Sequence, residues 1–98
     1  MKLTREILVS YDIEDNRSRK KIYDGLKDIG LYPIQKSVFV GDVKTAEEKA
    51  VKRLLSQFLD KKTDKSFILC GQIIEQIKTT GIGYKEDELD IYGKSFVL

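Results

Sequence analysis

Residues 6–13 (EILVSYDI) show the alternation of a β-strand, because β-branched, aromatic and apolar side chains recur at every second position. A pleated strand places these side chains on two faces: Ile7, Val9, Tyr11 and Ile13 on one, and Leu8, Ser10 and Asp12 on the other. We therefore expect Asp12 at the end of a strand, on its less apolar face.

The following segment has the periodicity of a helix instead. Its apolar residues recur at helical spacing, at Ile22, Leu26 and Ile29. Asp15 or Asn16 is a suitable N-cap, and Gly30 is a suitable C-cap. The sequence therefore predicts a helix over residues 16–29.

The middle of the chain combines a strand-like segment with a second helix. Residues 32–43 (YPIQKSVFVGDV) fit either one long bent strand or a tight hairpin, and Pro33 confines its own position to a strand start or an edge. Thr45 and Glu48 match the T-x-x-E capping box, so a helix should begin there. The apolar stripe of this helix consists of Ala46, Ala50, Val51, Leu54, Leu55 and Phe58.

The last third of the chain is less regular. Residues 66–71 (SFILCG) predict a buried strand, with Cys70 as a small apolar core residue. Residues 72–79 (QIIEQIKT) fit a short helix or a strand equally well. Residues 81–93 are expected to be mostly loop, and residues 94–98 (KSFVL) a short terminal strand.

These elements predict an α+β sandwich with both helices on one face of the sheet. The ferredoxin-like βαββαβ unit is the natural candidate, with an extra strand at the C-terminus. We expect one domain over residues 1–80 and a tail over residues 81–98. The other face of the sheet would stay open, and an apolar strip on it would favour a homodimer.

The chain of 98 residues contains no histidine and one cysteine. Zinc sites built from cysteine and histidine are therefore excluded, as is nucleophilic catalysis that depends on histidine. A catalytic centre would have to rely on carboxylates and a hard cation such as Mg²⁺. A lone cysteine cannot form an internal disulfide, and no apolar run reaches membrane-spanning length, so we expect a cytoplasmic protein without a membrane segment.

Positive charge gathers at the start of the first predicted helix, although the formal net charge of the chain is only +2. The cluster consists of Arg17, Arg19, Lys20 and Lys21. Cations are disfavoured near the positive end of a helix dipole, and this placement makes sense if a polyanion docks beside them. The alternative interpretation is an ordinary solvated helix surface.

Several fragments occur together in an order that resembles a known family. They are Tyr11-Asp12 at the end of a strand, Asp15-Asn16 followed by Arg19, Gly30-Leu31, and residues 34–42 (IQKSVFVGD) before a capped helix. This set resembles the CRISPR-associated Cas-two family, the small adaptation nucleases. Residues 82–84 (IGY) before a short final strand also fit the resemblance.

The resemblance implies a ferredoxin-like homodimer in which the C-terminal strand joins the partner's sheet. It implies that Asp12 is the catalytic residue and that two copies of it hold Mg²⁺ across the two-fold axis. Members are described as metal-dependent endonucleases on RNA or double-stranded DNA that act in spacer acquisition. They also serve as the central subunit of the CRISPR integrase, where catalysis is dispensable.

Seven residues are predicted to bind nucleic acid: Tyr11, Arg17, Arg19, Lys20, Lys21, Ser37 and Phe39. For Tyr11 and Phe39 the alternative is core packing, and for Ser37 it is a hydroxyl on the strand surface. For Asp12 the alternative is a turn cap or an ion pair with arginine. One feature departs from the family pattern, because many members place a basic residue where this chain has Pro33. A phosphate contact from that position is then missing or comes from elsewhere.

Three other functions compete with a Mg²⁺-dependent nuclease. The chain could be a non-catalytic DNA-binding scaffold of the integrase, or a toxin-like ribonuclease of the same fold. A generic RNA-recognition module is the weakest alternative, since no predicted strand carries the paired aromatic residues of such a sheet.

Overall fold

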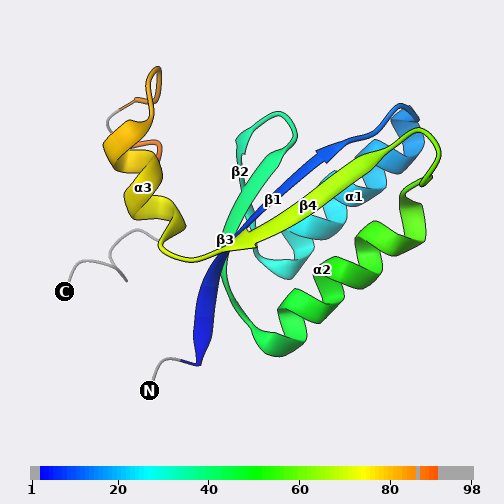
Figure 1. Ribbon diagram of the computed structural model, residues 1–98, viewed down its shortest axis with the longest axis horizontal. Helices are drawn as coiled ribbons and strands as arrows, with labels where there is room; N and C mark the ends of the chain where they lie inside the picture. Colours follow the sequence, from blue (N-terminus) through cyan, green and yellow to red (C-terminus); the bar gives the residue numbers. More distant parts are fainter. Residues whose placement is uncertain (1–2, 86, 91–98) are drawn as a thin grey trace.

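Four strands form one antiparallel sheet in the computed structural model, which describes residues 3–85 and 87–90 (Figure 1). The elements in chain order are β1 (Thr4–Asp12), α1 (Asn16–Ile29), β2 (Tyr32–Gln35), β3 (Val38–Lys44), α2 (Thr45–Phe58), β4 (Lys65–Cys70) and α3 (Ile73–Thr80). The strand order β2-β3-β1-β4 is that of the ferredoxin-like unit. The α+β class is thus confirmed.

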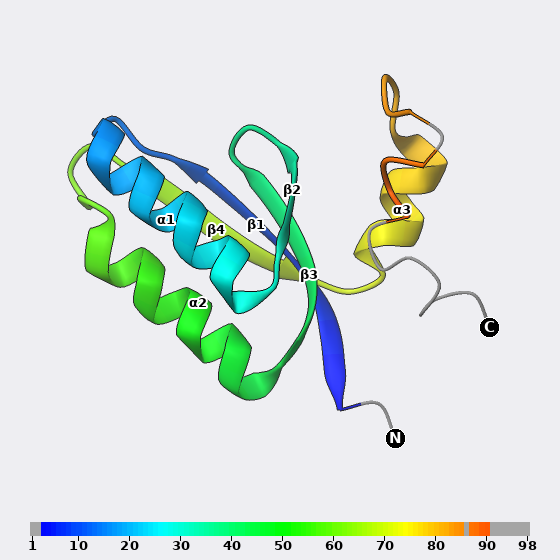
Figure 2. The same ribbon diagram turned by 180° about the vertical axis from the view of Figure 1, so that it is seen from behind.

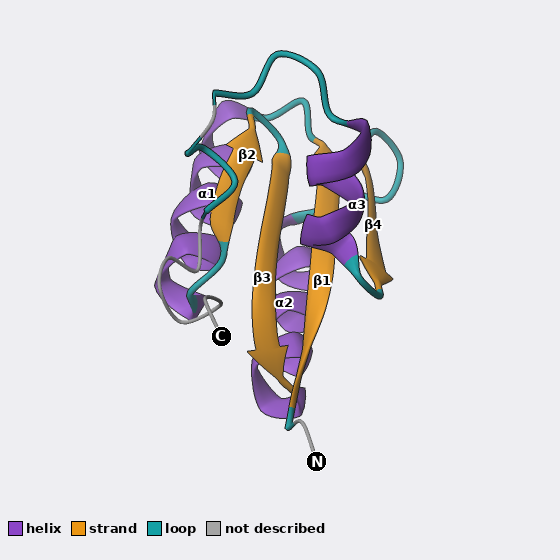
Figure 3. Ribbon diagram, turned by 90° about the vertical axis from the view of Figure 1, so that its left-hand side faces the viewer, coloured by secondary structure: helices purple, strands orange, loops and turns teal. Residues whose placement is uncertain are grey.

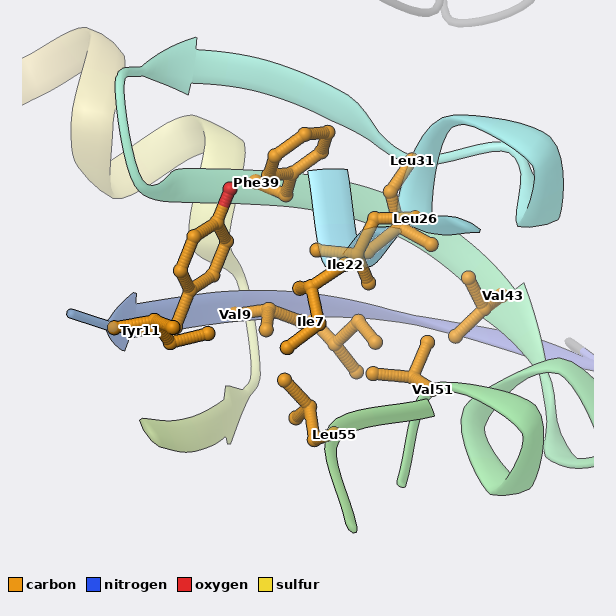
Figure 4. Packing of buried hydrophobic residues seen from close by; sticks show 11 residues of the cluster. Ile7, Val9, Tyr11, Ile22, Leu26, Leu31, Phe39, Val43, Val51 and Leu55 are labelled. Atoms are coloured by element: carbon orange, nitrogen blue, oxygen red, sulfur yellow. The ribbon is translucent and has the colours of Figure 1, made fainter. Parts of the chain in front are cut away.

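The core lies between the sheet and two helices. α1 and α2 lie side by side on one face of the sheet (Figure 2). The predicted inward-facing residues are all buried: Ile7, Val9 and Tyr11 of β1, and Ile13 directly after its end. They pack against Ile22 and Leu26 of α1 and Val51 and Leu55 of α2 (Figure 4). The predicted alternation of β1 is confirmed.

The two ends of α1 lie where the sequence predicts them. The carboxylate of Asp15 accepts a hydrogen bond from the backbone N–H of Ser18 at 2.8 Å, as an N-cap does. Gly30 ends the helix with φ at 115°, a left-handed conformation that glycine adopts without a steric penalty. The predicted bounds of 16–29 are those observed.

Residues 32–44 form a tight hairpin, which decides between the two predicted possibilities. The predicted capping box of α2 is wrong. Lys44 is the N-cap, and its backbone N–H donates to the carboxylate of Glu47 at 2.8 Å. Glu48 instead accepts two hydrogen bonds from Arg5 of β1, each at 2.7 Å, so its side chain serves tertiary packing.

The outer face of the sheet is partly covered, which corrects the expectation of an open face. Residues 73–80 form α3, and this helix lies on the side opposite α1 and α2 (Figure 3). Ile73 and Ile74 pack with Val40 of β3 and Leu8 of β1. The backbone N–H of Ile74 also donates to Glu6 of β1 at 2.9 Å.

β4 is an edge strand, and its outer face remains exposed. Phe67 and Leu69 each expose 53% of their surface, and Cys70 is exposed as well, so the predicted buried strand is only half correct. The predicted terminal strand at residues 94–98 lies outside the described residues. Within the described chain, no helix has the length and apolar character needed to cross a membrane.

Candidate functional site

Asp12 is the last residue of β1 and its side chain is exposed. Its register partner on β4 is Lys65. Within the described residues its carboxylate makes no hydrogen bond or ion pair, so the predicted alternative of a cap or an arginine pair is not seen there. Asp12 thus presents a carboxylate to solvent at the end of a central strand.

The loop after Asp12 is held by two contacts. The guanidinium of Arg19 donates to the backbone carbonyl of Ile13 at 3.0 Å. The next residue, Glu14, donates its backbone N–H to the carboxylate of Asp64 at 3.1 Å. Both contacts restrain the backbone directly beside Asp12, which orders the strand end on which the candidate carboxylate lies.

Asp64 is a supporting residue that sequence reasoning missed. It is 6% exposed and also accepts hydrogen bonds from the Asp60 backbone N–H at 2.9 Å and the Thr63 hydroxyl at 3.0 Å. Hydrogen bonds from the backbone of Asp60 and Glu14 lower the pKa of Asp64 below its ordinary value. In the sequence it is one of several acids in a polar turn, and no local signal marks it as buried.

A pocket of about 600 Å³ lies beside this strand end. It is formed by the end of β1, one face of α1 and the β2–β3 turn. Its lining residues are Tyr11, Asn16, Arg19, Lys20, Tyr23, Asp24, Lys36 and Ser37. The pocket therefore brings together four of the seven predicted nucleic-acid residues, which come from three separate segments.

The three cationic side chains of the pocket, Arg19, Lys20 and Lys36, differ in the hydrogen bonds and ion pairs that they make. Arg19 donates to the carbonyl of Ile13 and to the side-chain oxygen of Asn16. Lys20 pairs with Asp24 at 2.7 Å, and this hydrogen bond raises the pKa of Lys20 above its ordinary value. Lys36 makes no ion pair with any residue that the structure describes.

Tyr11 and Phe39 belong to the core beneath the pocket. The ring of Phe39 is fully buried, 6.3 Å from the ring centroid of Tyr11 and 5.2 Å from that of Tyr23. Phe39 thus has no surface with which to touch nucleic acid and supports the two tyrosines instead. The hydroxyl of Tyr11 is buried and has no hydrogen-bond partner among the described residues, and this burial raises the pKa of Tyr11.

The other two predicted basic residues lie outside the pocket lining. The ammonium of Lys21 lies 5.8 Å from the ring centroid of Phe58, so this side chain extends towards α2. Arg17 is exposed in the first turn of α1. The basic cluster therefore divides over the faces of the helix, with Arg19 and Lys20 on the pocket face.

A metal ion at this place could use the carboxylate of Asp12 as a ligand. Among residues 3–85 and 87–90, no three acidic, histidine or cysteine side chains gather closely enough to hold a metal. Mg²⁺ commonly binds one or two carboxylates and fills its other positions with water and phosphate oxygens. The exposed oxygen atoms of Asp12 fit that role as a single ligand.

Comparisons with known proteins agree with this architecture. The family model for CRISPR associated protein Cas2 matches residues 5–77. The CRISPR-associated endoribonuclease Cas2 1 of Francisella tularensis subsp. novicida (strain U112) is 43% identical over 96 residues, which span 95% of this chain and 98% of that protein. A CRISPR-associated endoribonuclease Cas2 of Korarchaeum cryptofilum (strain OPF8) is 42% identical over 50 residues, 51% of this chain and 54% of that protein.

Two solved structures share the fold. The Cas2 structure from Streptococcus pyogenes has a TM-score of 0.62 and 28% identity, over 72% of this chain and 92% of that one. A hypothetical protein from Thermus thermophilus has a TM-score of 0.64 and 29% identity, over 69% of this chain and 82% of that one. Sequence and structure together show that the chain belongs to the CRISPR associated protein Cas2 family.

Proposed function

We propose that this chain is a Mg²⁺-dependent endonuclease that hydrolyses phosphodiester bonds of RNA or double-stranded DNA during CRISPR spacer acquisition. The observation that carries the proposal is an exposed carboxylate, Asp12, on a restrained strand end beside a pocket lined by cations. A nuclease is supported by the name endoribonuclease, which is carried by a relative that matches 95% of this chain.

Asp12 would hold the metal, and two copies of the chain would supply two such carboxylates. A homodimer is supported by the apolar side chains of Phe67 and Leu69, which are exposed on the outer face of the sheet to which Asp12 also belongs. Because α3 covers another part of that face, the second copy would have to pack beside this helix. The predicted terminal strand could then join the partner's sheet.

The chain's own residues would bind and orient the nucleic acid. Bound Mg²⁺ would offset phosphate charge and make a coordinated water more acidic. Arg19, held by Ile13 and Asn16, would keep its positive charge beside the phosphate chain. The chain contains no histidine to act as a general base, so the expected chemistry is slow.

Asp12→Asn tests the proposal in a cleavage assay with labelled RNA and duplex DNA, with Mg²⁺ or with EDTA. We expect Mg²⁺-dependent cleavage to fall by about 100-fold or more, since a metal contributes several kcal/mol to the transition state. Asp28→Asn, an exposed acid at the other end of α1, is the matched control and should cleave normally. Unchanged cleavage by Asp12→Asn would show that Asp12 is not the metal ligand.

A non-catalytic scaffold of the CRISPR integrase is the second candidate. It is favoured by a cation-lined pocket in a structure whose described residues form no cluster of three or more metal-ligating side chains. A wild-type chain that binds duplex DNA and the integrase subunit, yet cleaves neither RNA nor DNA with Mg²⁺, would support the scaffold over the nuclease. Light scattering on the purified protein measures whether it is a homodimer.

A further inference from the structure

The β2–β3 turn carries a cation whose charge is not compensated within the described structure. We propose that Lys36 is the main phosphate-binding residue of the pocket and that it binds a backbone phosphate of the nucleic acid. The inference rests on the proposed function in that the ligand is a nucleic acid, but it needs neither metal nor cleavage.

A backbone hydrogen bond attaches the turn that carries Lys36 to β1. The carbonyl of Ser37, its neighbour in the turn, accepts a hydrogen bond from the backbone N–H of Tyr11 at 3.1 Å. Tyr11 directly precedes Asp12 on β1. The turn is therefore attached to the end of β1. Asp12 faces the other side of the sheet from Tyr11 and does not line the pocket, so a nucleic-acid chain held by Lys36 would have to pass over this strand end to reach it.

A comparison of the charges in the pocket singles out Lys36. Lys20 is paired with Asp24 at 2.7 Å, and Arg19 already donates to two oxygen atoms of the β1–α1 segment. Lys36 is exposed and makes no ion pair within the described residues. Its ammonium is thus the cation that can turn to a phosphate without breaking an existing contact.

The strand that leads into the turn offers no other cation. Residues 32–35 (YPIQ) carry no charged side chain, and Pro33 also lacks a backbone N–H donor. On the facing wall, Asp15 caps the first turn of α1 and Asp24 pairs with Lys20. Arg19 has no carboxylate partner within the described residues, so the lining residues of this wall remain net positive. Both walls of the pocket therefore favour an anion, and Lys36 provides the charge on the hairpin side.

The pocket is larger than one phosphate and contains aromatic surface. Its volume of about 600 Å³ accommodates a phosphate with the adjoining sugar, and the ring of Tyr23 forms part of its wall. An open pocket of this kind suits a continuous polynucleotide backbone. Terminal phosphates and inorganic phosphate share the same chemistry, and the experiment separates them.

The test measures binding by fluorescence anisotropy in EDTA, with labelled single-stranded RNA and duplex DNA over a range of KCl concentrations. For Lys36→Ala we expect an affinity loss of about 5- to 10-fold near physiological salt. The slope of log affinity against log salt should fall by about 0.9 on duplex DNA and about 0.7 on single strands, which corresponds to one lost phosphate contact. Lys36→Arg should retain both the affinity and the slope.

Lys49→Ala is the matched control, because Lys49 is an exposed lysine in α2, near the end of the sheet that lies away from Asp12. It changes net charge by the same amount and should alter affinity less than twofold. Equal losses in the two variants, or an unchanged salt slope in Lys36→Ala, would overturn the inference. An effect confined to oligonucleotides with a 5′-phosphate, or competition by millimolar inorganic phosphate, would overturn the assignment to a backbone phosphate.

The two proposals can fail independently. If Asp12→Asn abolishes cleavage while Lys36→Ala binds as the wild type does, the proposed nuclease function is supported and the proposed role of Lys36 is refuted. If no form of the protein cleaves but Lys36→Ala loses one phosphate contact, the role of Lys36 is supported and the protein is a non-catalytic binder. Circular dichroism checks that both variants fold, which the exposed turn position of Lys36 leads us to expect.

Discussion

The hydroxyl of Tyr11 is a buried polar group without a hydrogen-bond partner in the part of the chain that the structure describes, and Tyr11→Phe removes it. The phenyl ring of the variant keeps the contact with Phe39, whose ring centroid lies 6.3 Å away, and opens a space of one oxygen atom only. An unsatisfied buried polar group lowers the free energy of unfolding, because its hydrogen bonds to water are lost and nothing replaces them. We therefore expect Tyr11→Phe to be more stable than the wild type.

The size of the effect follows from the same argument. A buried donor or acceptor without a partner costs about 1–3 kcal/mol. Removal of the oxygen also loses a few dispersion contacts, so we expect a net gain of about 1 kcal/mol. For a domain of this size, that corresponds to a rise in Tm of about 4–8 °C.

The measurement is urea unfolding followed by circular dichroism at one fixed protein concentration, since dimerisation would make stability depend on concentration. The midpoint should rise by roughly 0.5 M or more with an unchanged m-value. Tyr23→Phe is the control, because Tyr23 is only half-buried, and its stability should stay within about 0.5 kcal/mol of the wild type. A destabilised Tyr11→Phe would mean that the hydroxyl makes a favourable hydrogen bond in solution, and the reasoning would be refuted.

Two further predictions concern the buried acids. Arg5 lowers the pKa of Glu48 below 4.5 through their hydrogen bonds, so the pair stabilises the fold above that pH and the contribution is lost as pH falls through the lowered pKa. Glu48→Gln should lower the free energy of unfolding by about 1 kcal/mol at pH 7 and make it less dependent on acid pH. Urea titrations at several pH values measure this, and a pH profile parallel to that of the wild type would contradict it. Asp64→Asn should speed hydrogen exchange at the Glu14 amide by more than tenfold, as NMR can measure, and unchanged protection would show that Asp64 does not hold the loop.

Much of the fold could be predicted because its signals are local. The alternation from Ile7 to Ile13 and the caps at Asp15 and Gly30 depend on the backbone geometry of one element, and each was confirmed. The capping box of α2 failed because neighbouring glutamates compete for the same role. Which of Glu47 and Glu48 caps the helix depends on Arg5, which lies 43 residues away from Glu48.

The candidate site was predictable in part. The resemblance named Asp12, Tyr11, Arg19 and Ser37, and the structure places the last three in one pocket beside the first. The sequence alone could not show that Lys36 joins them, because residues 32–43 fit one long bent strand as well as a tight hairpin.

The sequence by itself determined the class of the fold, the inward face of β1 and the ends of α1, because side-chain direction within one element follows from its period. The tertiary structure decided which residues meet. It buried Asp64 under the loop that follows Asp12, laid α3 over part of the outer face and attached the turn of Lys36 to the end of β1. These contacts join segments that are far apart in the chain, and they depend on strand pairing and packing, which no local pattern records.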